Sequence, residues 1–309
     1  MNKNRLLLSL LIFQLISLLF ISVSLDCVYA RAKDEGKAPV PEEVAIARPT
    51  ADEVQLAERA LDDFLKNADP SIKKINLKYP GLISVRIPRE NTAIVPNLAP
   101  FFLMKHQENL RVAEQGDIDV LFMGDSITDF WRNTEGTFAG KPILDKYFGH
   151  LKVANFGIAG DTTQGVLYRL QNGEGQGFSP KAVMLMIGTN NTMQNNAPEI
   201  AEGIGAVVLE LKKDFPDAKI LLLGIFPRGT PNDPVRATVK EINEIISRLH
   251  DGDRVHYLDI GSEFLDASGN IPEDVMTDAL HPSTKGYEIW ANAVKEPLEK
   301  LINQGGVGE

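Results

Sequence analysis

Four short turns of this sequence carry side chains that could together attack an ester. One holds Ser126, whose hydroxyl becomes a nucleophile when a base lies within hydrogen-bond reach. A second holds Asp278 and His281, spaced so that one turn would bring the carboxylate to one ring nitrogen and leave the other facing the serine. The turns at 155–161 and 188–191 supply glycine N–H groups and an asparagine amide, which could donate to a developing oxyanion.

Each of these turns also has a purely structural interpretation. A Gly-Asp-Ser sequence usually just forms a turn, and the Gly-Thr-Asn-Asn sequence at 188–191 could be a helix start capped by asparagine. Gly157 and Gly160 could serve only to permit close packing. Trp131, soon after the serine, could face a bound ligand or pack in the core. The chemical interpretation therefore rests on the combination, in chain order, of turns at successive strand ends.

The run before Ser126 has the pattern of a strand buried on both faces. Residues 118–123 hold one charge and end at Gly124, which permits a sharp exit from the strand. Further apolar runs alternate with stretches of helical spacing. This alternation predicts an α/β domain with a parallel sheet covered on both faces, whose strand ends share one edge where sites form. The expected strands are 118–123, 152–155, 182–187, 219–226 and 255–258, and the expected helices are 162–170, 198–215, 234–250 and 282–302.

The first 30 residues have the pattern of a secretion signal. Lys3 and Arg5 form a basic start, an apolar run covers 6–25, and Ala30 offers a cleavage site. We therefore expect export, to the periplasm or outside the cell, after cleavage near Ala30. The alternative is a retained membrane anchor, because the apolar run is long enough to span a bilayer.

Three segments lie between or beyond the signal and the α/β domain. Residues 31–50 are rich in Pro, Ala, Lys and Glu without a period, which predicts a mobile linker. Apolar spacing predicts an amphipathic helix over 51–67, whereas the prolines of 68–100 predict irregular chain. The expected order is a signal over 1–30, a linker over 31–50, a partly helical extension over 51–105, the α/β domain over 106–303 with a helix at 102–114 leading into its first strand, and a tail over 304–309.

Composition excludes several other classes of protein. The one cysteine, Cys27, lies in the predicted signal, so the mature chain would have no disulfide, zinc–cysteine site or thiol nucleophile. Removing the signal takes the net charge from −10 to −11, which argues against nucleic acid or an anionic membrane surface as a partner and suits a neutral substrate. No Gly-x-Gly-x-x-Gly motif occurs, which argues against a dinucleotide-binding oxidoreductase.

The four turns resemble the sequence blocks of the SGNH, or GDSL-type, hydrolases. The family name stands for Ser, Gly, Asn and His, which match Ser126, Gly160, Asn190 and His281. The resemblance implies a nucleophilic Ser126 in a triad with His281 and Asp278. It implies an oxyanion hole from the Ser126 N–H, the Gly160 N–H and the Asn190 side chain. It also implies a three-layer, flavodoxin-like parallel sheet and a reaction that needs neither metal nor cofactor.

Within that family the sequence is similar to the catalytic subunits of platelet-activating-factor acetylhydrolase. The resemblance covers about residues 117–302 and implies a serine esterase that hydrolyses short-chain esters, acetyl esters first, through an acyl-enzyme. Its substrate would be a small ester, such as an acetylated carbohydrate or a lipid. The alternatives are a lysophospholipase or lipase-type acylhydrolase, and a non-catalytic binding member of the fold. The similar stretches are 155–163, 166–174, 188–191 and 223–229.

Overall fold

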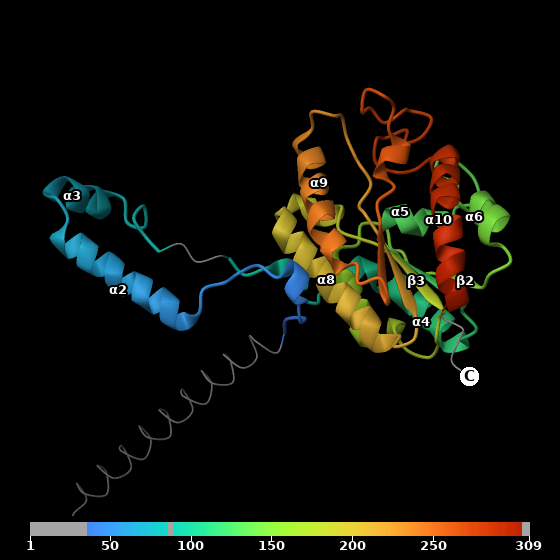
Figure 1. Cartoon of the computed structure of the whole chain (residues 1–309), viewed down its shortest axis with the longest axis horizontal. Helices are drawn as coiled ribbons and strands as arrows, with labels where there is room; N and C mark the ends of the chain where they lie inside the picture. The colour runs from blue at the N-terminus through green and yellow to red at the C-terminus, as the bar shows by residue number, and fades with distance from the viewer. Residues whose placement is uncertain (1–35, 86–88, 305–309) are drawn as a thin grey trace, which may run out of the picture.

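The computed structural model describes residues 36–85 and 89–304 (Figure 1). The signal expected over 1–30 and nearly all of the tail expected over 304–309 lie outside these ranges. Within them, no helix is both long and apolar enough to cross a membrane.

A five-stranded parallel sheet forms the centre of the molecule, in the order β2-β1-β3-β4-β5. This order is that of flavodoxin-like sheets, so the predicted fold class is confirmed. All strand ends point to one edge, as Gly124 at the end of β1 pairs with Met186 at the end of β3. The strands are β1 Val120–Gly124, β2 Val153–Asn155, β3 Ala182–Met186, β4 Lys219–Leu223 and β5 Val255–Leu258.

Helices cover both faces of this sheet, because successive strand residues point to opposite sides. Leu121 and Met123 belong to a core shared with α7, α8 and α9, whereas Val120 and Phe122 belong to a core shared with α5, α6 and α10. These helices are α5 Ser126–Asp129, α6 Lys141–Phe148, α7 Thr163–Arg169, α8 Ala197–Asp214, α9 Pro234–Ile246 and α10 Thr284–Gln304, with α4 Leu103–Gln115 ahead of the first strand. Short helices are η1 Glu42–Val44, η2 Thr92–Ile94, η3 Pro100–Phe102, η4 Phe130–Arg132, η5 Leu170–Glu174, η6 Asn190–Met193, η7 Ser247–Leu249 and η8 Gly261–Phe264.

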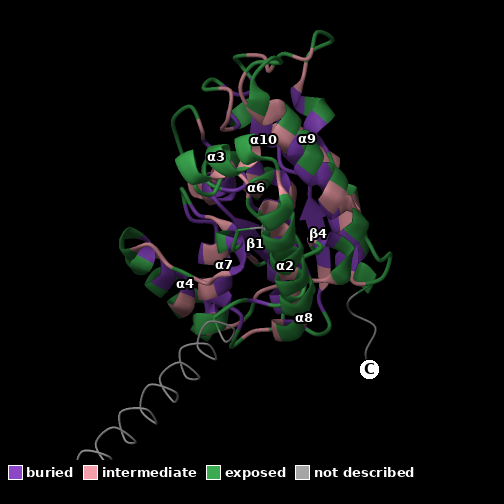
Figure 2. Cartoon of the chain, turned by 90° about the vertical axis from the view of Figure 1, so that its left-hand side faces the viewer, coloured by how far each residue is buried: buried purple, intermediate pink, exposed green. Residues whose placement is uncertain are grey.

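Two helices, α2 (Ala51–Asn67) and α3 (Pro70–Lys78), form an arm that stands off from the domain (Figure 1). Neither helix contains a buried residue, and Figure 2 shows α2 mostly in the colour of exposed residues. The chain was expected to be irregular from 68 to 100. It forms α3 there because Asp69 caps the helix and Pro70 occupies its first turn, where proline is tolerated.

The chain on either side of this arm is attached to the domain. Ala38 and Val44 are buried, and the Ala38 N–H donates to the Ile94 carbonyl at 2.8 Å. A Cβ at Gly205 of α8 would lie 2.6 Å from Val44 Cγ2, so the described part of the segment predicted as a mobile linker packs against α8. The segment is rich in proline and charged residues, so the sequence did not indicate that Ala38 and Val44 would belong to the hydrophobic core.

Candidate active site

Ser126 is the first residue of α5, directly after the central strand. Gly124 makes this turn possible, because a Cβ at that position would lie 2.3 Å from the Met186 carbonyl oxygen. Asp125 caps the helix, and its Oδ1 accepts from the Ile127 N–H at 3.0 Å. The sheet edge and the cap together place the serine hydroxyl at the carboxyl end of the strand, as the sequence predicted.

The structure brings Ser126, His281 and Asp278 together in one line of hydrogen bonds. Ser126 Oγ lies 2.9 Å from His281 Nε2, and His281 Nδ1 lies 2.6 Å from Asp278 Oδ2. The other carboxylate oxygen, Oδ1, accepts from the backbone N–H groups of Leu280 and His281 at 3.0 and 2.7 Å. Ala279, between Asp278 and Leu280, has φ = 55°, a left-handed conformation that closes this tight turn. Both carboxylate oxygens of Asp278 are thus used to orient the imidazole ring.

Local contacts hold the imidazole and keep Asp278 charged. The rings of Phe130 and Phe138 lie beside that of His281, with centroids 5.1 and 5.5 Å away. Partial burial acts to raise the pKa of Asp278, but its hydrogen bonds from His281 and Leu280 outweigh burial and hold that pKa below its usual value. The carboxylate is therefore ionised at neutral pH and can stabilise a positively charged imidazole.

The predicted oxyanion donors lie on neighbouring loops at the same sheet edge. Gly160 follows β2 with φ = 87°, and a Cβ there would lie 3.5 Å from the Phe102 ring. Asn190 follows β3, and its Nδ2 donates to the Asp161 carbonyl at 2.8 Å, which leaves a second hydrogen on that nitrogen. Among the described residues, neither the Ser126 N–H nor the Gly160 N–H donates to a backbone carbonyl. These donors are free to bind an anion.

A buried charged network supports the loop that carries Gly160. The Asp161 carboxylate accepts from Arg169 Nε at 2.9 Å, and Arg169 Nη1 donates to the Phe156 carbonyl at 3.0 Å and pairs with Glu174. Glu174 Oε1 in turn lies 2.7 Å from His106 Nδ1 of α4. Burial raises the pKa of Asp161 despite its arginine partner. The network joins the loop after β2 to α7, η5 and α4.

Sequence reasoning assigned no role to the members of this network. Asp161, Arg169 and Glu174 all lie within the stretches that resemble the acetylhydrolase subunits, and charges inside otherwise apolar segments were the available signal. The partner of His106 was not detectable, because Glu174 lies 68 positions away. Trp131 is fully buried among aromatic rings, so of its two interpretations the structure selects packing.

Asp125 is a buried carboxyl group directly beside the serine. Burial raises its pKa to about 7, and the charge of Asp161 adds to that rise, whereas the Ile127 N–H and Arg228 oppose it. Arg228 belongs to the loop after β4 and donates to the Thr189 carbonyl at 3.3 Å. Arg228 therefore connects the loops after β1, β3 and β4, through its electrostatic interaction with Asp125 and its hydrogen bond to Thr189.

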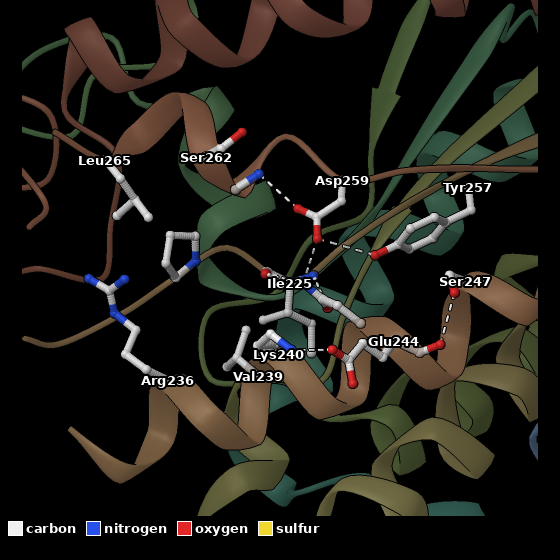
Figure 3. Close-up of a pocket in the computed structure, with 13 residues that line it drawn as sticks. Ile225, Arg236, Val239, Lys240, Glu244, Ser247, Tyr257, Asp259, Ser262 and Leu265 are labelled. Carbon is white, nitrogen blue, oxygen red and sulfur yellow. Dashed lines mark hydrogen bonds and ion pairs between the residues drawn. The ribbon is translucent and has the colours of Figure 1, made fainter. Parts of the chain in front are cut away.

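A separate cavity of about 640 Å³ lies between α9 and the end of β5 (Figure 3). Asp259, in its wall, accepts from the Gly261 N–H at 2.8 Å, from Asn243 Nδ2 at 3.2 Å and from the Tyr257 hydroxyl at 3.4 Å. Arg236 donates to backbone carbonyls, including that of Arg228 at 2.8 Å. These polar groups already satisfy one another. The cavity includes none of the five predicted site residues, so it is not the predicted reaction site.

Across the described ranges, no group of three or more His, Cys, Asp or Glu side chains is arranged to hold a metal ion. The acidic and histidine side chains near the serine instead pair with one another or with backbone N–H groups, as Asp278 and His281 do.

Comparison with known proteins identifies the family of this chain. A family model described as the GDSL-like lipase/acylhydrolase family matches residues 122–289, more than half of the chain. The chain belongs to this family. It is accordingly a carboxylic ester hydrolase, as the sequence predicted.

Two acetylhydrolase subunits are among the relatives of this GDSL-type hydrolase. It is 34% identical over 221 residues to human platelet-activating factor acetylhydrolase IB subunit alpha2, an alignment that covers 69% of this chain and 91% of the relative. It is 34% identical over 200 residues to the rat alpha1 subunit, covering 64% and 83%.

Solved structures show the same fold. A GDSL-like lipase from Bacteroides thetaiotaomicron superposes with a TM-score of 0.52 at 19% identity, covering 64% of this chain and 97% of that one. A member of the lipolytic G-D-S-L family from Veillonella parvula gives a TM-score of 0.50 at 20% identity, covering 59% and 98%. In each case a large part of this hydrolase, a third or more of the chain, lies outside the match.

Proposed function

We propose that this hydrolase is an exported serine esterase that removes short acyl groups, acetyl first, through an acyl-enzyme on Ser126. The observation that carries the proposal is the hydrogen-bonded line from Ser126 Oγ to His281 Nε2 and from His281 Nδ1 to Asp278. A serine hydroxyl needs a base within this reach to become a nucleophile, and the base needs a partner that fixes its tautomer.

The acylation step follows from that line. As Ser126 Oγ bonds to the ester carbonyl carbon, its proton passes to His281 Nε2, and the carbonyl oxygen becomes an oxyanion. The Ser126 N–H, the Gly160 N–H and Asn190 Nδ2 donate to it, and Asp278 stabilises the charged imidazole. His281 then gives its proton to the leaving alkoxide as the C–O bond breaks. Water, deprotonated by His281, then bonds to the acyl carbon; the bond from that carbon to Ser126 Oγ breaks, and His281 returns the proton to Oγ as the acid leaves.

Two observations support the substrate class. Both curated relatives described above carry the word acetylhydrolase in their names, and the chain's negative charge suits a neutral ester. Acetylated carbohydrate and lipid are the two classes of alcohol we propose. Export follows from the pattern of residues 1–30, and mass analysis of the protein from its native host should find a mature chain that starts at Arg31.

The decisive test is hydrolysis of p-nitrophenyl acetate by the purified mature chain beside Ser126→Ala and His281→Ala. Each variant should lose a factor on the order of 10⁴ or more in kcat. Ser262→Ala is the matched control, because this exposed serine lines the separate cavity of Figure 3. Equal rates for wild type and Ser126→Ala would end the assignment.

A series of p-nitrophenyl esters of increasing acyl length tests the acyl preference. We expect kcat/KM to fall steeply beyond short acyl groups. A preference for long chains would instead support the lipase-type alternative. Release of acetate from acetylated glycans and from acetylated phospholipids would then separate the two classes of alcohol.

A further inference from the structure

The far end of the α2–α3 arm exposes large apolar side chains that belong to neither hydrophobic core of the described chain. Leu77 is 84% exposed, Leu82 67% and Tyr79 51%. They lie at the end of α3 and in the turn after it, which is closed by a hydrogen bond from the Leu82 N–H to the Tyr79 carbonyl at 3.1 Å and by Gly81 at φ = 89°. Apolar side chains of this size are seldom grouped on a free surface without a binding role.

The same tip is cationic, although the whole chain is acidic. Residues 70–85 contain three Lys and no Arg, Asp or Glu, against a net charge of −10 for the chain. Lys73 Nζ donates to the Lys66 carbonyl at 2.6 Å, and Lys78 Nζ lies 5.0 Å from the centre of the Tyr79 ring. Within the described ranges Lys73, Lys74 and Lys78 form no ion pair with a carboxylate. Their charge is available to an external anion.

We propose that this tip, residues 73–82, docks on the surface of an anionic lipid bilayer. Leu77, Tyr79 and Leu82 would enter the boundary between headgroups and acyl chains, and the three lysines would lie among the negative headgroups. Interfacial membrane-binding segments combine these features: an aromatic ring at headgroup level, leucines below it and lysines above it. The net charge of the whole chain argues against binding to an anionic membrane. Salt screens charges more than about 10 Å from the bilayer, however, so the charge of the tip determines whether the protein is attracted to it.

A bilayer fits this tip better than a second copy of the chain. Ile75 and Leu77 are two positions apart in α3, so they do not face the same side. Ile75 and Tyr79, four positions apart, do face one side, so Leu77, the most exposed of these side chains, lies outside the one stripe that could pack on a helix. A fluid lipid surface accepts apolar groups around a protruding turn without a matching groove.

Sedimentation with vesicles tests the proposal, using the mature chain from Arg31. We expect binding to vesicles of phosphatidylcholine with 30% phosphatidylglycerol, weakened by salt, and little binding to phosphatidylcholine alone. The variant Lys73→Gln/Lys74→Gln/Lys78→Gln should bind about fivefold more weakly per lysine, on the order of a hundredfold in total. Leu77→Ser/Tyr79→Ser/Leu82→Ser should also lose binding.

The matched control neutralises three exposed lysines of the domain, Lys146, Lys152 and Lys295, and should bind as wild type does. Hydrolysis of p-nitrophenyl acetate, which is water-soluble, should be the same in all of these proteins, which separates failure of docking from failure of the reaction. No binding by wild type, or equal loss in control and tip variants, overturns the proposal. So does concentration-dependent dimerisation, seen by ultracentrifugation, that the tip variants abolish.

Discussion

Replacing Asp278 by asparagine should cut kcat while leaving the fold intact, and the structure sets the size of the effect. The new amide has two orientations. With its oxygen toward the backbone it keeps the N–H bonds of Leu280 and His281, but it then presents an NH₂ group to His281 Nδ1. That nitrogen must become the acceptor, which moves the ring proton to Nε2, the atom that faces Ser126. In this orientation the base is already protonated.

Two contributions make up the expected loss. Two backbone hydrogen bonds outweigh one to the ring by about 1 kcal/mol, so the wrong orientation is favoured about fivefold. The variant also lacks the negative charge beside the imidazolium. That charge would be worth about 4 kcal/mol at 4 Å in a half-buried site, and solvent at this 43% exposed side chain reduces it to about 2–3 kcal/mol. Together these predict a loss of 10²–10³ in kcat.

Steady-state hydrolysis of p-nitrophenyl acetate measures this loss, with urea unfolding as the check on the fold. Asp274→Asn is the matched control: Asp274 lies on the same loop and is exposed, but it pairs with Lys285 rather than with the imidazole. The control should stay within about twofold of wild type, because exposed ion pairs contribute little. If Asp278→Asn keeps a third or more of the wild-type kcat, the carboxylate does not orient the base and the reasoning is refuted.

Three further changes have effects that the structure predicts. Asn190→Ala should lower kcat by 10²–10³ with little change in KM, because it removes a donor to the oxyanion; an unchanged kcat would exclude that role. Asp125 has a native pKa of about 7, above its unfolded value, so it adds stability below about pH 4 that is lost as pH rises through 7. The free energy of unfolding, measured with urea at several pH values in that range, should therefore fall by up to about 4 kcal/mol less in Asp125→Asn than in wild type. If the two proteins showed the same pH dependence, the raised pKa of Asp125 would be contradicted. Ala279→Gly should leave the free energy of unfolding unchanged or up to about 1 kcal/mol higher, and Ala279→Val should lower it by about 2 kcal/mol, because φ is positive there.

The sheet and the predicted catalytic residues could be read from the sequence because both depend on local signals. Buried parallel strands are continuous apolar runs, and the turns that follow them carry Ser126, Gly160 and Asn190. Parallel pairing brings these turns to one edge without further information. Asp278 and His281 are three residues apart, so their hydrogen bond is also a local event.

The features that the sequence did not reveal are long-range. The contact of His106 with Glu174 joins residues with no local pattern in common, and Asp125 has an unusual pKa only because the folded chain buries it. The apolar contacts of residues 36–50 come mainly from Ala38 and Val44, which are too few and too small to give a periodic signal. Composition favours flexibility there, and tertiary contacts override it.

The attachment of the extension shows which part of it the domain needs. Arg48 pairs with Glu202 at 2.6 Å and Arg89 with Glu199 at 2.5 Å. These glutamates are three positions apart on α8, so they are neighbours on its surface, about 5–6 Å apart. The chain thus leaves and returns to α8 at nearly the same place. The arm between these two attachments has no buried residue, and a short linker could replace it.

We therefore expect a chain in which a Gly/Ser linker replaces residues 51–85 to unfold in urea within about 1 kcal/mol of wild type and to hydrolyse p-nitrophenyl acetate normally, because no buried contact is lost. Deleting 31–105 instead removes the cationic partners of Glu199 and Glu202. An unpaired buried charge costs about 3–5 kcal/mol, and Ala93 and Ile94 would leave a gap in the core. Against a typical total of about 5–15 kcal/mol, that chain should not fold stably. If it did, with normal activity, the α/β domain would begin near residue 106, as the sequence suggested; if it did not, the functional unit would include the segments on both sides of the arm.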